Sequence, residues 1–221
     1  KAYLPVILVT AEIKTESDFV GALTITSKDD AVKFGYYKLA DNLVWGRNVN
    51  GTGDFWDPEA SAELGFRGTF DGNGYTVSTA DGIKVYNGGF FGLIGKGAVI
   101  KNVTFTVTVA NALGVFGSQG HNATVQDVTI NFKANGAPTN TAGGVFFARF
   151  SGTITYKNVT VNAAGQDLQT IFGNSLGSNV PNCENVVVNA KSLVAIGYGS
   201  FNGAPITTLK GFTFNKTETL E

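Results

Sequence analysis

One short segment of the sequence gathers the residue types that recognise sugars and cations. Residues 51–59 read GTGDFWDPE, with acidic and aromatic side chains side by side. An exposed Phe55 or Trp56 ring would stack on a sugar, while Asp54 and Asp57 would accept hydrogen bonds from hydroxyl groups or bind calcium. The spacing is not that of an EF-hand loop, and the alternative is a connecting loop whose aromatic rings pack over the core. The candidate ligand-binding residues are therefore Asp54, Phe55, Trp56 and Asp57, with no catalytic residue, metal ligand or cofactor assigned.

Carboxylates are sparse in most of the chain, which bears on enzyme function. Polysaccharide lyases and hydrolases need clustered carboxylates, often with Arg or Lys nearby. Of the 17 acidic residues ten precede Phe66, and between residues 88 and 215 only three remain, namely Asp127, Asp167 and Glu184. We therefore expect a non-catalytic protein. The alternative, a polysaccharide-active enzyme, requires acids from the first third of the chain to meet Asp127 or Arg67 in a groove; those acids are Asp54, Asp57 and Asp71.

The single His and the single Cys do not form a recognisable site. His121 stands between Gly120 and Asn122, which predicts a solvated turn residue rather than a catalytic base. Cys183 falls at an apolar repeat position, which favours a buried small hydrophobe over a reactive thiol. One Cys and one His also exclude a disulfide framework and a Cys/His zinc site.

Composition and charge narrow the class of protein. The net charge is −1, and only 15% of the residues are charged. A basic surface for nucleic acid or an anionic membrane is therefore missing, and no apolar run is long enough to span a bilayer. Counts of 29 Gly, 24 Thr, 23 Val and 20 Asn describe a chain of strands and turns.

A repeat organises most of the chain. Its central apolar positions recur at spacings of 25 to 31 residues, at Val77, Val103, Val128, Val159, Val186 and Phe212. A Phe- and Gly-rich anchor such as 89–92 or 114–117 precedes each later copy. Apolar and polar residues alternate within each copy, as in Val103, Thr104 and Phe105, which predicts strands rather than helices. A unit of this length with short strands and Gly/Asn turns is one coil of a parallel β-helix.

Stacked coils predict columns of like residues. The inward columns hold the six central positions and an aromatic stack of Phe91, Phe116, Phe147 and Phe172. One outward row begins at Ser78 and Thr104, and the next contains Thr106 followed by Asn residues. The column Asn102, Asp127, Asn158 and Asn185 fits a turn ladder whose amides hydrogen-bond from coil to coil. The glycosylation sequons at Asn102 and Asn158 arise from this turn pattern, so we do not assign glycans to them.

The start of the repeat array resembles a known family. Residues 66–77 read FRGTFDGNGYTV, and Gly89–Gly92 and Ile100–Val103 follow. This order is similar to the signature of bacterial cell-surface β-helix repeat proteins, including the GLUG-motif group, over about residues 13–215. The resemblance implies a module of a large secreted or wall-attached protein, located outside the cell or on its surface beside neighbouring domains of that protein.

These observations predict an all-β fold, a single right-handed parallel β-helix of about six to seven coils with an N-terminal cap. Residues 1–12 would be a linker or a remnant of a preceding domain, 13–65 the cap and lead-in strand, and 66–218 the repeats. Thr15 and Asp18 would begin a short capped helix over the open end of the core. The expected function is adhesion, or weak binding of a glycan or a host surface protein, with a purely structural spacer as a further alternative.

Overall fold

The computed structural model describes residues 7–25, 32–49, 63–86, 88–110, 114–135, 144–177, 179–199 and 203–218. The elements in chain order are β1 Ala11–Ile13, α1 Glu16–Leu23, β2 Tyr36–Leu39, β3 Leu43–Trp45, β4 Thr69–Asp71, β5 Thr76–Thr79, β6 Gly92–Ile94, β7 Val99–Ala110, β8 Gly117–His121, β9 Thr124–Asn135, β10 Phe147–Ser151, β11 Thr155–Leu168, β12 Asn174–Ser175, β13 Asn182–Leu193, β14 Gly197–Tyr198, β15 Pro205–Ile206 and β16 Phe212–Lys216.

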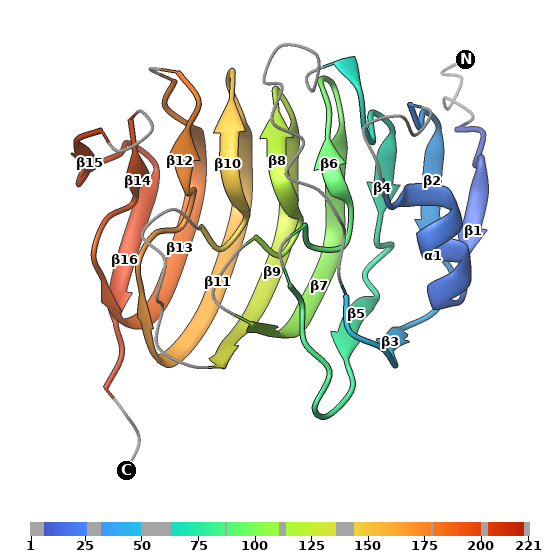
Figure 1. Cartoon of the computed structure of the whole chain (residues 1–221), viewed down its shortest axis with the longest axis horizontal. Coiled ribbons are helices and arrows are strands. Elements are labelled where there is room, and N and C mark those ends of the chain that lie inside the picture. Colours follow the sequence, from blue (N-terminus) through green and yellow to red (C-terminus); the bar gives the residue numbers. More distant parts are fainter. Residues whose placement is uncertain are drawn as a thin grey trace, which may run out of the picture.

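The strands stack into a parallel β-solenoid of about six turns, which confirms the predicted fold class (Figure 1). Within the described ranges, ten strands form one sheet in the order β1-β2-β4-β7-β9-β11-β13-β16, with β3 and β5 pairing beside it. A second sheet of six described strands runs β15-β14-β12-β10-β8-β6. Among these pairings only β14 with β15 is antiparallel. Apolar side chains from both sheets fill the space between them.

The predicted inward column is confirmed except at its first member. Val103, Val128, Val159, Val186 and Phe212 pair in register from coil to coil. Val77, however, pairs with Phe105, and Ser78 pairs with Thr106 rather than Thr104. The turn after Asp71 is longer than the later turns and shifts the register. Gly72 occupies the space beside Val103, where an added Cβ would lie 2.3 Å from the Val103 Cβ.

The interior aromatic stack follows a different path from the predicted one. Ring contacts run through Phe116, Phe146 and Phe172, with centroids 5.7 and 5.6 Å apart. Phe147 is also buried and contacts Phe116 from the side, while Phe91 packs against the first coils. Both Phe residues of the 146–147 pair are buried, so alternation along the sequence does not show which ring continues the stack.

Helix α1 lies over the N-terminal end of the core (Figure 1). The Thr15 hydroxyl accepts a hydrogen bond from the Asp18 amide, and the Asp18 carboxylate accepts one from the Thr15 amide, which confirms the expected capped helix. Phe19 then packs against Trp45 and Phe70 in the first coils. None of the helices in the described ranges is long and apolar enough to cross a membrane.

Two polar ladders run along the outside of the solenoid. In the turn ladder, Asn102, Asp127, Asn158 and Asn185 all have positive φ, between 49° and 58°. The Nδ2 of Asn158 donates to Asp127 Oδ1 at 2.9 Å, and that of Asn185 donates to Asn158 Oδ1 at 3.1 Å. The second ladder lies on the strands, where successive amides donate to the preceding coil; its members are Thr106, Asn131, Asn162, Asn189 and Asn215. The predicted turn ladder is therefore confirmed, and the strand ladder adds to it.

The two contributions of a ladder Asn can be separated at Asn158. Asn158→Gly keeps the positive φ and loses the amide hydrogen bonds, so we expect a loss of about 1 kcal/mol in the free energy of unfolding. Asn158→Ala loses the same hydrogen bonds and also places at positive φ a residue without the polar side chain that lets Asn tolerate this conformation, so we expect a loss of about 2 kcal/mol. Urea denaturation measures both values. Asn189 is the matched control: it lies in a strand, where Gly should be more destabilising than Ala. The same order of the Gly and Ala variants at both positions would contradict this account.

Candidate functional site

A shallow polar depression lies where the turn ladder passes the first repeats. Its volume is about 400 Å³, and its walls come from the end of β4, the following turn and the corners of β7 and β9. The lining residues are Asp71, Asn73, Gly74, Asn102, Val103, Thr104, Asp127 and Thr129. Oxygen atoms of carboxylates, amides and hydroxyls therefore dominate the lining.

The stacking of coils brings these side chains together. Asp71 pairs with Lys101, which in turn pairs with Gln126 on the next coil. Asn102 and Asp127 come one residue later, at the corner where the left-handed backbone turns the chain into the next strand. Asn102 and Asp127 follow Asp71 by 31 and 56 residues in the sequence. All three face the same depression, because each lies at the same corner of its own coil.

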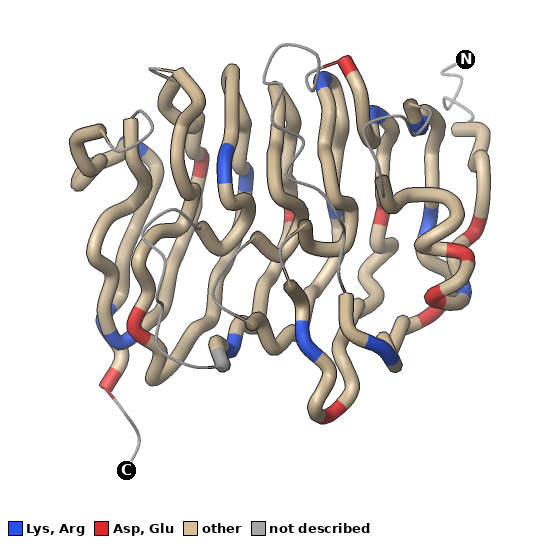
Figure 2. Tube along the Cα trace, in the orientation of Figure 1, with Lys and Arg blue, Asp and Glu red and all other residues tan. Residues whose placement is uncertain are grey.

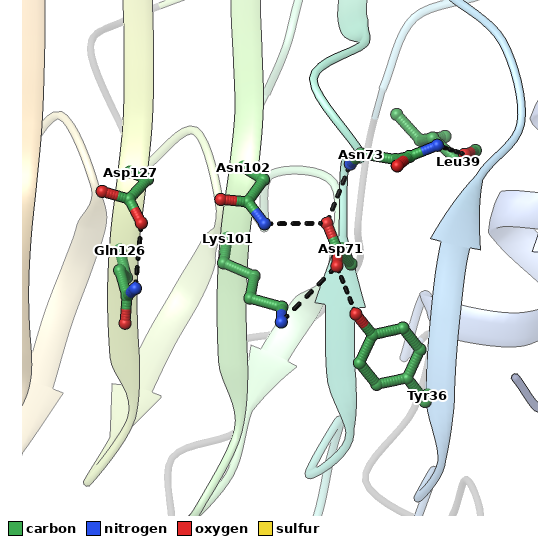
Figure 3. A network of polar contacts seen from close by, with 8 residues as sticks. All are labelled: Tyr36, Leu39, Asp71, Asn73, Lys101, Asn102, Gln126 and Asp127. Atoms are coloured by element: carbon green, nitrogen blue, oxygen red, sulfur yellow. Dashed lines mark hydrogen bonds and ion pairs between the residues drawn. The ribbon is translucent and has the colours of Figure 1, made fainter. Parts of the chain in front are cut away.

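Asp71 is held in place in the depression by several neighbouring groups (Figure 3). It accepts hydrogen bonds from the Tyr36 hydroxyl, from the Asn73 amide at 2.8 Å and from Asn102 Nδ2 at 3.1 Å. The Lys101 ammonium lies 3.5 Å from its Oδ2. Burial alone would raise the pKa of Asp71, but these donors and the Lys101 charge outweigh it, so the pKa lies below its ordinary value. Asp71 is therefore ionised at neutral pH.

Lys101 and Tyr36 complete the wall beside Asp71. The Lys101 ammonium lies 5.2 Å from the centre of the Tyr36 ring, a cation–π contact. Burial would lower the pKa of Lys101, yet the Tyr36 hydroxyl and the Asp71 charge raise it overall. Burial and the hydrogen bond to Asp71 raise the pKa of Tyr36. Lys101 thus stays positive and Tyr36 stays protonated, and both are engaged by Asp71.

The turn ladder is interrupted inside the depression. Asn102 donates through its Nδ2 to Asp71, and its side-chain oxygen Oδ1 points toward Asp127 (Figure 3). Asp127 has no amide hydrogen to return, and no hydrogen bond within the described residues joins the two side chains. Donors from Asn158 and Gln126 lower the pKa of Asp127, so it too is ionised. We call this gap between Asn102 and Asp127 the open rung.

The open rung presents acceptor oxygens to the solvent, and none of the described residues places a donor between them. Neighbouring coils lie about 4.8 Å apart, so a hydroxyl or an ordered water would fit between the two oxygens and donate to either. The ionised Asp127 makes such hydrogen bonds stronger than neutral ones. Chemically, the depression suits a ligand rich in hydroxyl groups.

The residues that the sequence singled out have different outcomes. Asp54, Phe55, Trp56 and Asp57 lie outside the described residues, so their assignment stays a prediction. Asp71 and Asp127, one of the pairs that the enzyme alternative requires, line the same depression two coils apart. Arg67 lies elsewhere, held by Glu63 at 2.8 Å and stacked on the Phe34 ring. Across the described ranges, no group of three His, Cys, Asp or Glu side chains is arranged to hold a metal ion.

The prediction for His121 was wrong, because it is fully buried in β8. Its Nδ1 contacts the Ser151 hydroxyl, and its Nε2 lies 3.3 Å from Gln119 Oε1. Burial lowers the pKa of His121 to about 4. Cys183 is half-buried against the core and in register with Tyr156, and burial raises its pKa to about 12, as expected for a packed rather than a reactive thiol.

Comparisons with known proteins do not identify a relative. No family model matches the chain, and no match is found among curated proteins or solved structures.

Replacing the acid of the open rung tests the geometry directly. In Asp127→Asn, Oδ1 still accepts from Asn158 and the new Nδ2 can donate to Asn102 Oδ1. The Nδ2 replaces the oxygen that accepts from Gln126, whose partly exposed side chain then hydrogen-bonds to solvent. We expect the free energy of unfolding to rise by about 0.5–1 kcal/mol, measured by urea denaturation. Asp167→Asn is the matched control: Asp167 is bound by Lys191 and Ser192, so its replacement should not stabilise the protein. A destabilised Asp127→Asn variant would contradict the ladder geometry.

Burial of neutral His121 predicts a dependence of stability on pH. Its folded pKa of about 4 lies below the unfolded value of 6.5, so the unfolded chain binds the proton more readily between these values. The stabilisation is complete above pH 6.5 and decreases as the pH falls toward 4, by about 3 kcal/mol in total. Denaturation midpoints measured across this range should show the slope, and His121→Gln should flatten it. An unchanged slope in His121→Gln would assign the dependence to other groups.

Proposed function

We propose that this chain is a non-catalytic binding module of an extracellular bacterial surface protein, and that it adheres through weak contacts with glycans. The observation that carries the proposal is the open rung. One hydrogen bond of the turn ladder is missing there, and two acceptor groups face the solvent. Sites that depart from the locally most stable choice are often functional. Asn at position 127 would continue the ladder; the chain has Asp there instead.

The chemistry of the depression favours hydroxyl donors. Asp71 and Asp127 are both ionised, the side-chain Oδ1 of Asn102 accepts no hydrogen bond within the described residues, and Thr104 and Thr129 add hydroxyl groups. Sugars offer many hydroxyls that donate to such acceptors. Because the depression is shallow, it would contact few sugar units, which fits weak binding that gains strength from several copies on one surface.

The solenoid supports this role mechanically. Each coil is joined to its neighbours by backbone hydrogen bonds and by the two polar ladders, so the depression is held on a rigid body. The location outside the cell rests on the resemblance of residues 66–103 to surface β-helix modules. A host surface protein with exposed hydroxyl or amide donors is the other ligand that this site would accept.

One observation favours a second candidate function, hydrolysis of a polysaccharide. Asp71 and Asp127 line one depression two coils apart, which is about 10 Å and close to the carboxylate spacing of inverting glycosidases. Such an enzyme needs one carboxylic acid that keeps its proton near neutral pH. The pKa values of both residues are lowered instead. The pair is therefore better suited to accept hydrogen bonds than to donate a proton.

A glycan array followed by calorimetry with the best ligand tests the binding function. We expect Asp127→Asn to weaken binding by about tenfold, or 1.4 kcal/mol, while the fold stays intact. Asp167→Asn, which removes an acid outside the depression, should bind as the parent chain does.

Three other outcomes of these experiments would replace the proposed function. Binding that survives Asp127→Asn but is lost in Trp56→Ala would move the site to residues 54–57. Release of reducing ends from a polysaccharide, abolished in Asp71→Asn, would establish the enzyme instead. The absence of binding to any glycan or surface protein would leave the structural spacer.

A further inference from the structure

The open rung leaves two particular acceptor groups for a ligand to satisfy. Asn102 donates to Asp71, and its Oδ1 accepts no hydrogen bond within the described residues. Asp127 accepts from the neutral amides of Gln126 and Asn158, each at 2.9 Å. Each carboxylate oxygen can accept more than one hydrogen bond, so Asp127 still has acceptor capacity. A group that fills the open rung must therefore offer hydrogens to oxygens on two neighbouring coils at once.

The number of hydrogens on one donor atom separates the ligand groups that could fill this gap. A sugar hydroxyl and the N–H of an N-acetyl group each have a single hydrogen, which reaches one of the two acceptors. A protonated primary amine has three hydrogens, so it can donate to Asn102 Oδ1 and to Asp127 together. The two coils lie about 4.8 Å apart, a distance that two N–H···O hydrogen bonds of about 2.9 Å can span from one nitrogen.

The distribution of charge around the open rung also favours a cation. Charged positions are few on the middle coils, from β7 to β11 (Figure 2). The side chains in register along this part of the sheet are, in order, Glu12, Lys38, Asp71, Lys101, Gln126, Lys157 and Glu184. The open rung lies beside Gln126, the neutral member of this series. Lys38 is three coils away from Asp127, which is about 14 Å at 4.8 Å per coil.

The two nearer lysines are paired with acids on the sides that face away from the open rung. The Lys101 ammonium lies 3.5 Å from Asp71 on the preceding coil. The Lys157 ammonium lies 3.4 Å from Glu184 on the following coil. Within the described part of the chain no Lys or Arg forms an ion pair with Asp127, and the Lys101 charge is the smallest of the influences that lower its pKa. Asp127 is thus the acid of the depression without a direct cationic partner among these residues.

Two hydroxyl groups stand beside the open rung. Thr104 pairs in register with Thr129 on the next coil, and both line the depression together with Asn102 and Asp127. A 2-amino sugar has a hydroxyl group on a carbon next to the amine and further hydroxyl groups around the ring. These can exchange hydrogen bonds with the two Thr hydroxyls. A lysine side chain has only methylene groups beside its ammonium, so the amino sugar matches the lining better.

We infer that the open rung binds the protonated amine of a glycan that contains 2-amino sugars. The amine nitrogen donates to Asn102 Oδ1 and to the Asp127 carboxylate, and hydroxyl groups of the same ring contact Thr104 and Thr129. The ligand thereby supplies the hydrogen bond that Asp127 does not donate and completes the turn ladder. The assignment rests on the glycan-binding function proposed above, for which it names the class of sugar.

Calorimetry with two matched probes tests this assignment: a glucosamine tetramer, and the same tetramer with every amine acetylated. The titrations are made at slightly acidic pH, where the amines are protonated and Asp127 is ionised. We expect the parent chain to bind the glucosamine tetramer about fivefold more tightly, as one exposed ion pair allows. The ratio should fall toward one in about 1 M NaCl, which screens exposed charges. Asp167→Asn removes an acid outside the depression and should keep the fivefold ratio.

Two substitutions of Asp127 separate the charge from the closure of the rung. Asp127→Asn removes the charge and closes the rung, whereas Asp127→Gly removes the charge, tolerates the positive φ and leaves the rung open. Circular dichroism would show that both variants fold. Each should bind the two tetramers with equal affinity. A fivefold ratio that persists in either variant would overturn the assignment.

The remaining outcomes distinguish the assignment from the function on which it rests. Equal affinity of the parent chain for the two tetramers, or binding of neither, would overturn the assignment. A glycan without amines that binds the parent chain and loses affinity in Asp127→Asn would then leave the glycan-binding function standing. If no glycan binds, both are wrong. A tetralysine peptide that binds as tightly as the glucosamine tetramer would show that the ammonium group alone is recognised, which would overturn the choice of an amino sugar.

Discussion

A left-handed backbone conformation at the same corner of each repeat coil, from Asn102 to Asn185, is the constraint on which the solenoid depends. The corner redirects the chain between two strands, and only residues that tolerate positive φ can occupy it without strain. Asn meets this requirement and also carries an amide that reaches the neighbouring coil. The same residue therefore sets the local bend and the vertical spacing, and the buried Val that follows it always enters the core in register.

The depression exists because one corner of the turn ladder carries an Asp, at position 127, where its neighbours in the ladder carry Asn. Asp127 tolerates the corner conformation, with φ of 53°, but it cannot pass a hydrogen bond to the coil before it. Asn102 donates to Asp71 on the preceding coil, as the other ladder amides do, and Asp71 is held by Tyr36 and Lys101. Two neighbouring coils are thus left with acceptors facing each other, although their backbones pair without interruption.

The spacing of the repeated residues predicted the architecture, because stacked coils make equivalent residues recur at nearly constant intervals. It misplaced Val77, since the longer turn after Asp71 changes the register in a way that spacing alone does not show. The sequence around His121, Gly-His-Asn, predicted a solvated turn residue. This was wrong because the local sequence carries no information about the neighbouring coil that packs against it. The placement of Asp71 and Asp127 in one depression depends on the same contacts between neighbouring coils. The one available signal was an acid in a column of Asn residues.

Every amide in the two ladders donates toward the N-terminal side, so each coil presents acceptors on its C-terminal face and donors on its N-terminal face. A coil copied from the region between Asn158 and Asn189 would meet both neighbours with the hydrogen-bond partners they already use. Duplication or deletion of whole coils in this part of the chain would therefore change the length of the rod without requiring compensating substitutions. The coil that carries Asp127 cannot be exchanged in this way, because Asp127 does not donate a hydrogen bond to the coil before it.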